Sequence, residues 1–267
     1  MDFLSLIILL LIGCIVGFLA GFFGVGGGVI LVPVLLFFFA TQTIDARIIT
    51  HLAMGTSLFI VVFASFASAL KHQKQGNVFW KGVLFIGVSS IITAAIGTTV
   101  AAAIPGEVLQ KFFAIAVLTV SLRLFFEKTK TETAGHFNPS PIRLVIIGIT
   151  VGFLSALTGI GGGVFSIPLM YFLANFPIKR AIGTSSATVI ITASTSVIGY
   201  ALNGYGNVHL PAYTIGFVDY LHAIPLIIGT VIVGPFGAAA ANKTSSLMLR
   251  KLFAIYLFAN SIFMFIN

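Results

Sequence analysis

A glycine-rich stretch that occurs twice decides the fold of this chain. Its two copies are Gly24-Val25-Gly26-Gly27-Gly28-Val29 and Gly159-Ile160-Gly161-Gly162-Gly163-Val164. Each copy interrupts an apolar run. Because a glycine inside a helix costs about 1 kcal/mol relative to alanine, three glycines in succession predict that the helix unwinds there.

The repeat extends beyond the glycines and keeps the same order in both halves. Pro33 matches Pro168, Gly55-Thr56-Ser57 matches Gly183-Thr184-Ser185, Gly76-Asn77-Val78 matches Gly206-Asn207-Val208, and Lys111-Phe112-Phe113-Ala114-Ile115 matches Lys251-Leu252-Phe253-Ala254-Ile255. These blocks predict an internal duplication. We expect an N-terminal repeat over 1–127, a polar cytoplasmic linker over 128–141 and a C-terminal repeat over 142–267, which together form one integrated transmembrane domain.

The composition points to a lipid environment. Of the 267 residues, 58% are hydrophobic and only 7% are charged, whereas soluble domains average roughly 25% charged residues. So few charges could not cover the surface of a soluble globule, and disorder requires low hydrophobicity. The net charge of +8 comes from Lys and Arg in short loops between apolar runs, so it indicates a bilayer and no nucleic-acid partner.

The apolar runs predict an all-α polytopic membrane protein with eight to ten helical segments. They lie near 3–23, 29–40, 46–70, 80–104, 107–126, 142–158, 164–175, 180–202, 222–242 and 247–266. A spanning helix needs about 20 apolar residues, so 29–40 and 164–175 are too short. Each half is therefore expected to hold a Gly-broken, re-entrant, V-shaped unit plus three transmembrane helices. Full spanning by the V-shaped units stays an open alternative.

The distribution of positive charge predicts how the halves are oriented. Three crossings per half make the halves inverted, with both termini outside and the linker in the cytoplasm. Twelve of the fourteen Lys and Arg then lie on the cytoplasmic side, which satisfies the positive-inside rule, whereas parallel halves would divide them evenly. The two that remain outside are Arg47 and Lys111.

The glycine breaks are the first candidates for a binding site. Two inverted copies would point two helix N-termini, with their free N–H groups, at one midplane site that suits a small anion. The alternative is close helix packing by small residues. The predicted backbone ligands are Gly26, Gly27, Gly28, Gly161, Gly162 and Gly163.

Neutral hydroxyls and two cationic positions complete the candidate site. Thr56, Ser57, Thr184 and Ser185 could donate hydrogen bonds to an oxyanion, or they could bond between helices. His51 and Lys179 precede the two Gly-Thr-Ser blocks at the same spacing, and either could act as a gate or as an interfacial anchor.

An absence of acidic residues also shapes the prediction. No Asp or Glu falls inside a predicted span, so neither a carboxylate proton relay nor an acidic ring for cation selection is expected. The spans also contain no nucleophile–base pair and no cluster of metal ligands. We therefore expect no catalytic residues, no metal and no cofactor.

The paired motifs resemble those of a known family. Gly24–Pro33 and Gly159–Pro168, each followed by a Gly-Thr-Ser block, are similar to the motifs of the TauE/SafE sulfite-exporter family of membrane permeases. The resemblance implies a transporter of sulfur-containing anions such as sulfite, thiosulfate or organosulfonates, in the plasma (inner) membrane of a prokaryote. The first copy carries His51 where the second carries Lys179, so the cationic position differs between the halves.

The functional hypothesis is a secondary transporter that carries a small sulfur-containing anion by alternating access. A passive anion channel and a permease for another small organic anion are the alternatives. A membrane-embedded enzyme and an assembly factor are more distant hypotheses. The sequence leaves open the coupling ion, H⁺ or Na⁺, the direction of transport and the formation of a homo-oligomer.

Overall fold

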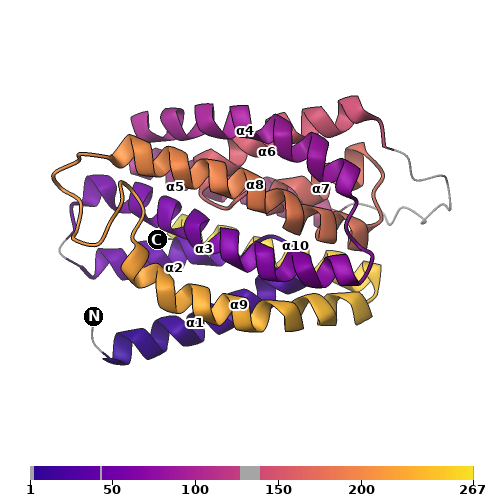
Figure 1. The fold of residues 1–267 in the computed structure, drawn as a ribbon, viewed down its shortest axis with the longest axis horizontal. Coiled ribbons are helices and arrows are strands. Elements are labelled where there is room, and N and C mark those ends of the chain that lie inside the picture. Colours follow the sequence, from indigo (N-terminus) through magenta and orange to yellow (C-terminus); the bar gives the residue numbers. More distant parts are fainter. Residues whose placement is uncertain (1–2, 43, 127–138, 267) are drawn as a thin grey trace.

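The computed structural model describes residues 3–42, 44–126 and 139–266, and within these ranges the chain forms ten helices and no strand (Figure 1). The helices are α1 (Phe3–Phe23), α2 (Gly28–Ala40), α3 (Ala46–Lys74), α4 (Trp80–Ala103), α5 (Gly106–Phe126), α6 (Pro141–Thr158), α7 (Gly163–Leu173), α8 (Ile178–Gly204), α9 (Tyr220–Lys243) and α10 (Ser246–Ile266). Each helix lies on a predicted apolar segment, which confirms the all-helical prediction. Residues 128–138 of the predicted linker over 128–141 lie outside the described residues.

Eight of these described helices are long and apolar enough to cross a membrane. They include α1 and α6, the first arms of the two V-shaped units. The second arms, α2 and α7, are shorter, with 13 and 11 residues. The prediction of two short arms is therefore confirmed, whereas re-entry into the membrane stays a prediction.

The helices break at the glycines as predicted. Gly26 and Gly27 have φ angles of 76° and 85°, and Gly161 and Gly162 have φ angles of 87° and 90°. Residues with a side chain rarely adopt this left-handed conformation. Gly27 caps the start of α2 and Gly162 caps the start of α7, so both half-helices begin directly at a break.

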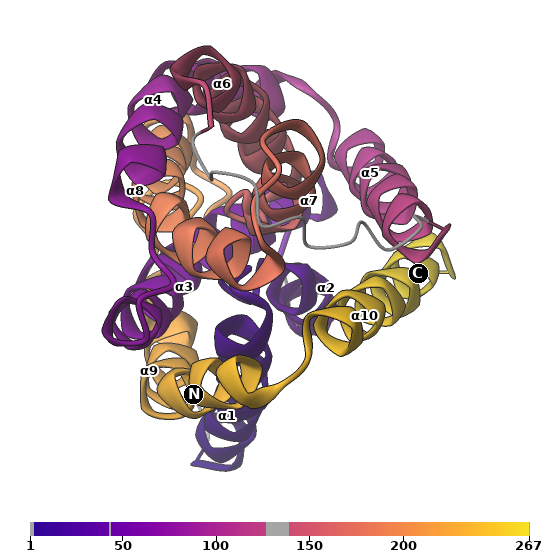
Figure 2. The same cartoon turned by 90° about the vertical axis from the view of Figure 1, so that its right-hand side faces the viewer.

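The two halves are interleaved (Figure 2). The first helix of each half packs against the fourth helix of the other, α1 against α9 and α6 against α4. The helices α3 and α8 pack on each other, and so do α5 and α10. Each half-helix contacts the third helix of its own half and the last helix of the other half. The packing thus follows the sequence repeat, while the inverted orientation of the halves stays a prediction.

Small residues allow the closest of these contacts. On α1, the Cα atoms of Gly13, Gly17 and Gly21 face the backbone of Leu226, Thr230 and Gly234 on α9, where a Cβ atom would not fit. Close backbone approach of this kind is typical of membrane helices. It joins the first helix of one half firmly to the fourth helix of the other.

Candidate functional site

The two glycine breaks meet in the interior of the protein. A Cβ atom on Gly26 would lie 2.6 Å from Cγ1 of Val61 and 3.3 Å from Cγ1 of Val189. A Cβ atom on Gly161 would lie 2.6 Å and 3.2 Å from the same two atoms. Both breaks therefore face one pair of valines, Val61 on α3 and Val189 on α8.

The backbones of the two breaks are also in direct contact. A Cβ atom on Gly28 would overlap the backbone of Ile160, and one on Gly163 would overlap the backbone of Val25. Close packing, the alternative explanation for the glycines, therefore applies at these two positions. It is also what brings the starts of α2 and α7 together.

The start of each half-helix carries backbone amides without an acceptor. No described residue accepts a hydrogen bond from the N–H groups of Gly26–Gly28 or Gly161–Gly163. Unpaired amides are expected in the first turn of a helix, where the helix dipole is positive. All six glycines are buried, so water does not cover these amides from the surface.

The two predicted threonines hold the start of another helix. The backbone N–H of Asp219, the residue that caps α9, donates to the Thr56 hydroxyl at 2.9 Å. The backbone N–H of Phe79, which caps α4, donates to the Thr184 hydroxyl at 3.0 Å. The threonines thus make equivalent contacts in the two halves, and each fixes the start of the fourth helix of the other half.

The two predicted serines differ. The Ser185 hydroxyl donates to the carbonyl of Gly24 at 2.9 Å and lies 2.7 Å from the Ser166 hydroxyl, so it ties α8 to the first break. The Ser57 hydroxyl is fully buried and has no hydrogen-bond partner among the described residues. Among the predicted hydroxyls, Ser57 is therefore the one without a hydrogen-bond partner in the described part of the chain.

Two further serines were missed by the sequence analysis. The hydroxyls of Ser65 on α3 and Ser155 on α6 are fully buried and lack a partner among the described residues. The Ser65 hydroxyl would lie 2.6 Å from a Cβ atom on Gly26, and the Ser155 hydroxyl 3.6 Å from one on Gly162. Aligning the halves would have marked both serines, because alanine faces the partner break at each equivalent position (Ala193 at Gly161 and Ala20 at Gly27).

The predicted gate residues both bond to the end of a helix. Nε2 of His51 lies 3.1 Å from the carbonyl oxygen of Ala101 and 3.2 Å from that of Ile104, at the end of α4. Because carbonyl oxygens only accept, Nε2 carries the proton. Lys179 donates to the carbonyl of Asn242 at 2.7 Å, near the end of α9. Each therefore supplies a donor to carbonyls at the end of a helix, where the helix itself leaves acceptors unused.

His51 also lines a cavity of about 880 Å³. One wall is the face of α2 that carries Pro33, Leu36, Phe37 and Ala40. The start of α3, the corner between α4 and α5, and Phe263 of α10 form the rest. Its polar lining consists of Arg47, Thr50, His51, Glu107 and Gln110.

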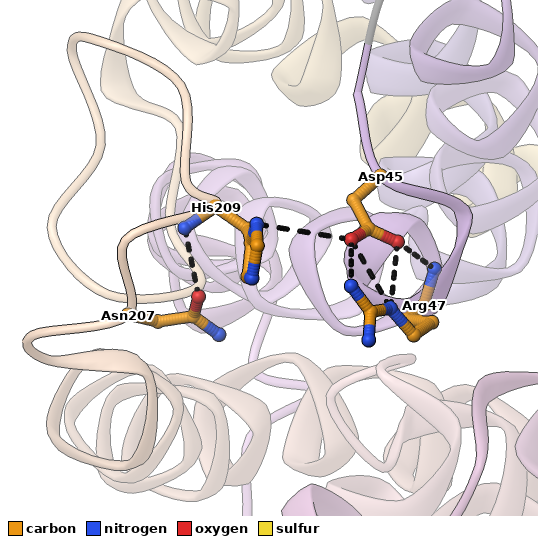
Figure 3. A network of polar contacts seen from close by, with 4 residues as sticks. All are labelled: Asp45, Arg47, Asn207 and His209. Carbon is orange, nitrogen blue, oxygen red and sulfur yellow. Dashed lines mark hydrogen bonds and ion pairs between the residues drawn. The ribbon is translucent and has the colours of Figure 1, made fainter.

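The positive charge of Arg47 in this cavity is compensated (Figure 3). Its guanidinium lies 2.6 Å from Oδ2 of Asp45, and His209 of the α8–α9 connection lies 3.9 Å from the same oxygen. The side chain of Asn207 accepts the backbone N–H of His209 at 3.0 Å, a contact typical of asparagine in a turn. The hydrogen bond from Arg47 holds the pKa of the Asp45 carboxyl well below its usual range.

The other end of the molecule is bridged by side chains from both halves. Asn77 donates to the side chain of Asn242 at 3.2 Å, and Gln75 donates to the carbonyl of Ala238 at 3.4 Å. Together with Lys179, these contacts join the α3–α4 turn and the start of α8 to the end of α9. The two ends of the protein therefore differ, since the cavity lies at one end and these side-chain bridges to the end of α9 lie at the other.

One acidic residue is buried at the start of α9, just before the predicted span over 222–242. Asp219 caps α9 and is 2% exposed, and its Oδ2 lies 2.6 Å from Nδ1 of His222. His222 is the first residue of the apolar run predicted over 222–242, and Asp219 lies three positions before it. The signal was their spacing at a helix start, which lets the capping side chain meet the residue three positions on. The described residues contain no cluster of three or more His, Cys, Asp or Glu side chains that could hold a metal ion.

These features define the class of the protein, a polytopic helical membrane protein with two glycine-broken helices that meet inside it. The family model for the sulfite exporter TauE/SafE matches residues 9–264. A "probable membrane transporter protein" of Haemophilus influenzae is 30% identical over 99% of this chain and 100% of its own length. One of Methanocaldococcus jannaschii is 31% identical over 98% of this chain and 97% of its own length. No solved structure matches.

The chain therefore belongs to the TauE/SafE sulfite-exporter family, as its motifs suggested. It is a multi-pass membrane protein and a membrane transporter.

Proposed function

We propose that this transporter is a secondary permease for small sulfur-containing anions such as sulfite, thiosulfate or organosulfonates, and not an enzyme. The observation that carries the proposal is the meeting of two helix N-termini, with unpaired amides, beside two buried hydroxyls without partners, those of Ser65 and Ser155. Ser57 on α3 supplies a third buried hydroxyl without a partner among the described residues. Amides and hydroxyls together donate hydrogen bonds to an oxyanion and carry no full charge, so they can bind an anion and still release it.

Alternating access of the site is the second part of the proposal. The cavity at the start of α3 extends to Pro33 on α2, and Pro33 lies a little more than one turn beyond Gly28. The bonds of Asn77 and Lys179 to Asn242 close the opposite end. We propose that anions enter through the cavity in this conformation and leave when the bridged end opens.

The proposed orientation follows from the charges. Both termini face outward across the plasma (inner) membrane of a prokaryote, and the end that carries Lys71, Lys74, Lys179 and Lys243 faces the cytoplasm. This places the cavity outside and the bridged end inside. Labelling of single cysteines at Asn77 and Asn207 in intact cells, in a Cys14→Ser background, tests it, because only the cysteine at 207 should react with an impermeant reagent.

The experiment that tests the substrate class measures binding and flux of the purified protein. Sulfite, thiosulfate, sulfate, taurine and sulfoacetate are added in a thermal-shift assay, and those that bind are then followed into proteoliposomes. We expect stabilisation by at least one sulfur-containing anion and saturable uptake. Stabilisation by cations or sugars alone would overturn the anion site, and large single-channel currents in a planar bilayer would favour a passive channel.

Single substitutions test the site itself. Ser65→Ala and Ser155→Ala should weaken anion binding about tenfold each, because a hydrogen bond to a charged group contributes about 1.5–3 kcal/mol. Neither should lower the melting temperature, since neither leaves a partner unpaired. Ser196→Ala is the matched control, because this fully buried hydroxyl bonds to the carbonyl of Thr192 in its own helix. Equal effects of the three variants on binding would remove Ser65 and Ser155 from the site.

A further inference from the structure

Asp219 is the one buried carboxylate among the described residues, and it pairs with a histidine. Its Oδ1 accepts the backbone N–H of His222 at 3.0 Å, and its Oδ2 lies 2.6 Å from the ring Nδ1. The Asp219 side chain is 2% exposed, whereas the His222 side chain is 19% exposed. The pair therefore has a buried carboxylate on one side and a partly exposed ring on the other.

The pairing fixes where a proton can bind. An ionised carboxylate only accepts hydrogen bonds, so Nδ1 of His222 carries a hydrogen and Nε2 of the neutral ring keeps its lone pair. Without a further proton, the pair has a net charge of −1. When Nε2 takes up a proton, the pair becomes an imidazolium and a carboxylate with a net charge of zero.

The groups packed around the pair leave this charge uncompensated. The described cation of α3 at this end is Arg47, which pairs with Asp45, and His51 of α3 bonds to carbonyls at the end of α4. In the α8–α9 connection, His209 lies near Asp45, and the ring of Tyr213 contacts that of Tyr220 on α9. The other helices that contact this part of α9 contribute Cys14 of α1 and no titratable side chain of α2. No described Lys or Arg forms an ion pair with Asp219.

The pair contacts α3 and α2, two of the helices that build the proposed anion site. The backbone N–H of Asp219 donates to Thr56, the neighbour of the unpartnered Ser57. The ring of His222 lies 4.8 Å from that of Phe38 at the end of α2, the half-helix that begins at the first break. In the other half, the equivalent position at the start of α4 is Phe79, so the fold offers this acid–base pair once.

We propose that the Asp219–His222 pair binds the coupling proton and that anion and proton are transported together, an inference that rests on the anion site proposed above. The proton binds at Nε2 of His222 and brings the net charge of the pair from −1 to zero. The pair then no longer repels the transported anion. Because coupling between two sites is reciprocal, a bound anion in turn strengthens proton binding.

Binding as a function of pH tests the assignment. Thiosulfate is the probe, because it does not change its own protonation near neutral pH, and sulfoacetate replaces it if thiosulfate does not bind. In the wild type, affinity should rise up to about tenfold per unit of falling pH across the range in which histidine titrates. His222→Gln removes the ring that takes up the proton, so affinity should shift less than about twofold over that range. Asp219→Asn keeps an acceptor for the cap and keeps the ring but removes the carboxylate that stabilises its charged form, so the rise in affinity should move to lower pH.

Asp45→Asn is the matched control, because Asp45 also caps a helix but is only partly buried and is paired with Arg47. It should keep the pH dependence of the wild type. An unchanged pH dependence in both Asp219→Asn and His222→Gln, with melting temperatures near that of the wild type, would overturn the assignment to this pair.

Proton movement gives the second measurement. Proteoliposomes in Na⁺-free buffer hold a pH-sensitive dye, and external probe anion should acidify the lumen in the wild type but not with His222→Gln. Anion uptake without acidification, or uptake that requires Na⁺, overturns proton coupling and leaves the anion site intact. If neither probe anion binds or enters, the anion site fails and the coupling proposal fails with it.

Discussion

The two glycine breaks have nearly the same backbone but different side chains around them. Gly26 and Gly161 have φ angles of 76° and 87°, and both face Val61 and Val189. Near the first break, α3 offers Ser65 where α8 has Ala193, and near the second break α6 offers Ser155 where α1 has Ala20. At each pair of equivalent positions, therefore, only one half carries a hydroxyl, whereas the backbone conformation is nearly the same in both halves.

This difference separates two kinds of requirement. The φ angles and the close contacts must be met in both halves, because two unwound segments can meet in the interior only if neither carries a side chain there. The hydroxyls need only be present once at each position to complete a single ligand shell. A site between two repeats can thus have a symmetric backbone, which we call the shared frame, and an asymmetric set of side-chain ligands.

The largest expected effect comes from alanine at the shared frame. Gly26→Ala and Gly161→Ala should each destabilise the protein by about 2–5 kcal/mol, because left-handed strain adds to overpacking against Val61. Anion uptake should be lost in both. Gly76→Ala is the control, since its φ of 71° imposes the same strain but its Cβ meets nothing within 4 Å. Thermal unfolding and proteoliposome uptake measure both effects, and equal losses for Gly76→Ala and Gly161→Ala would show that the contact with Val61 does not matter.

The serines of the Gly-Thr-Ser blocks should behave in opposite ways. Ser185→Ala leaves the Gly24 carbonyl without its donor and removes the bond to the Ser166 hydroxyl, so it should lower stability by about 1–3 kcal/mol. Ser57→Ala removes a hydroxyl without a protein partner, so the melting temperature should stay near that of the wild type while anion affinity falls. A loss of stability in Ser57→Ala equal to that in Ser185→Ala would mean that Ser57 has a structural role.

The sequence predicted the frame better than the ligands. Glycine triplets and apolar runs are local features, so the helix limits and the two breaks could be placed within a few residues. The surroundings of Ser65, Ser155 and the Asp219–His222 pair depend on how each helix is rotated about its axis. In a membrane the lipid-facing side is as apolar as the core, so hydrophobic periodicity does not reveal that rotation.

The donors at the helix ends predict a smaller difference between the halves. His51 is buried and supplies the end of α4 with two hydrogen bonds, so His51→Ala should cost about 1–2 kcal/mol. Lys179 is more exposed and donates to one carbonyl, so Lys179→Ala should cost about 0.5 kcal/mol. Chemical or thermal unfolding in detergent compares the two. A larger cost for Lys179→Ala would indicate that the bridge to Asn242 matters more than the cap on α4.

The smallest expected effect concerns the start of the third helix in each half, where Asp45 caps α3 and Pro177 caps α8. Arg47 lowers the pKa of Asp45, so the carboxylate's contribution to stability is complete above its unfolded-state pKa of about 4. The contribution is lost only as the pH falls through the lower pKa of the folded state. The stability difference between the wild type and Asp45→Asn should therefore stay constant between about pH 5 and 8 and shrink only in acid. Thermal unfolding across this range measures it, and a difference that changes near neutral pH would mean that Asp45 is coupled to His209, its other neighbour, and not to Arg47 alone.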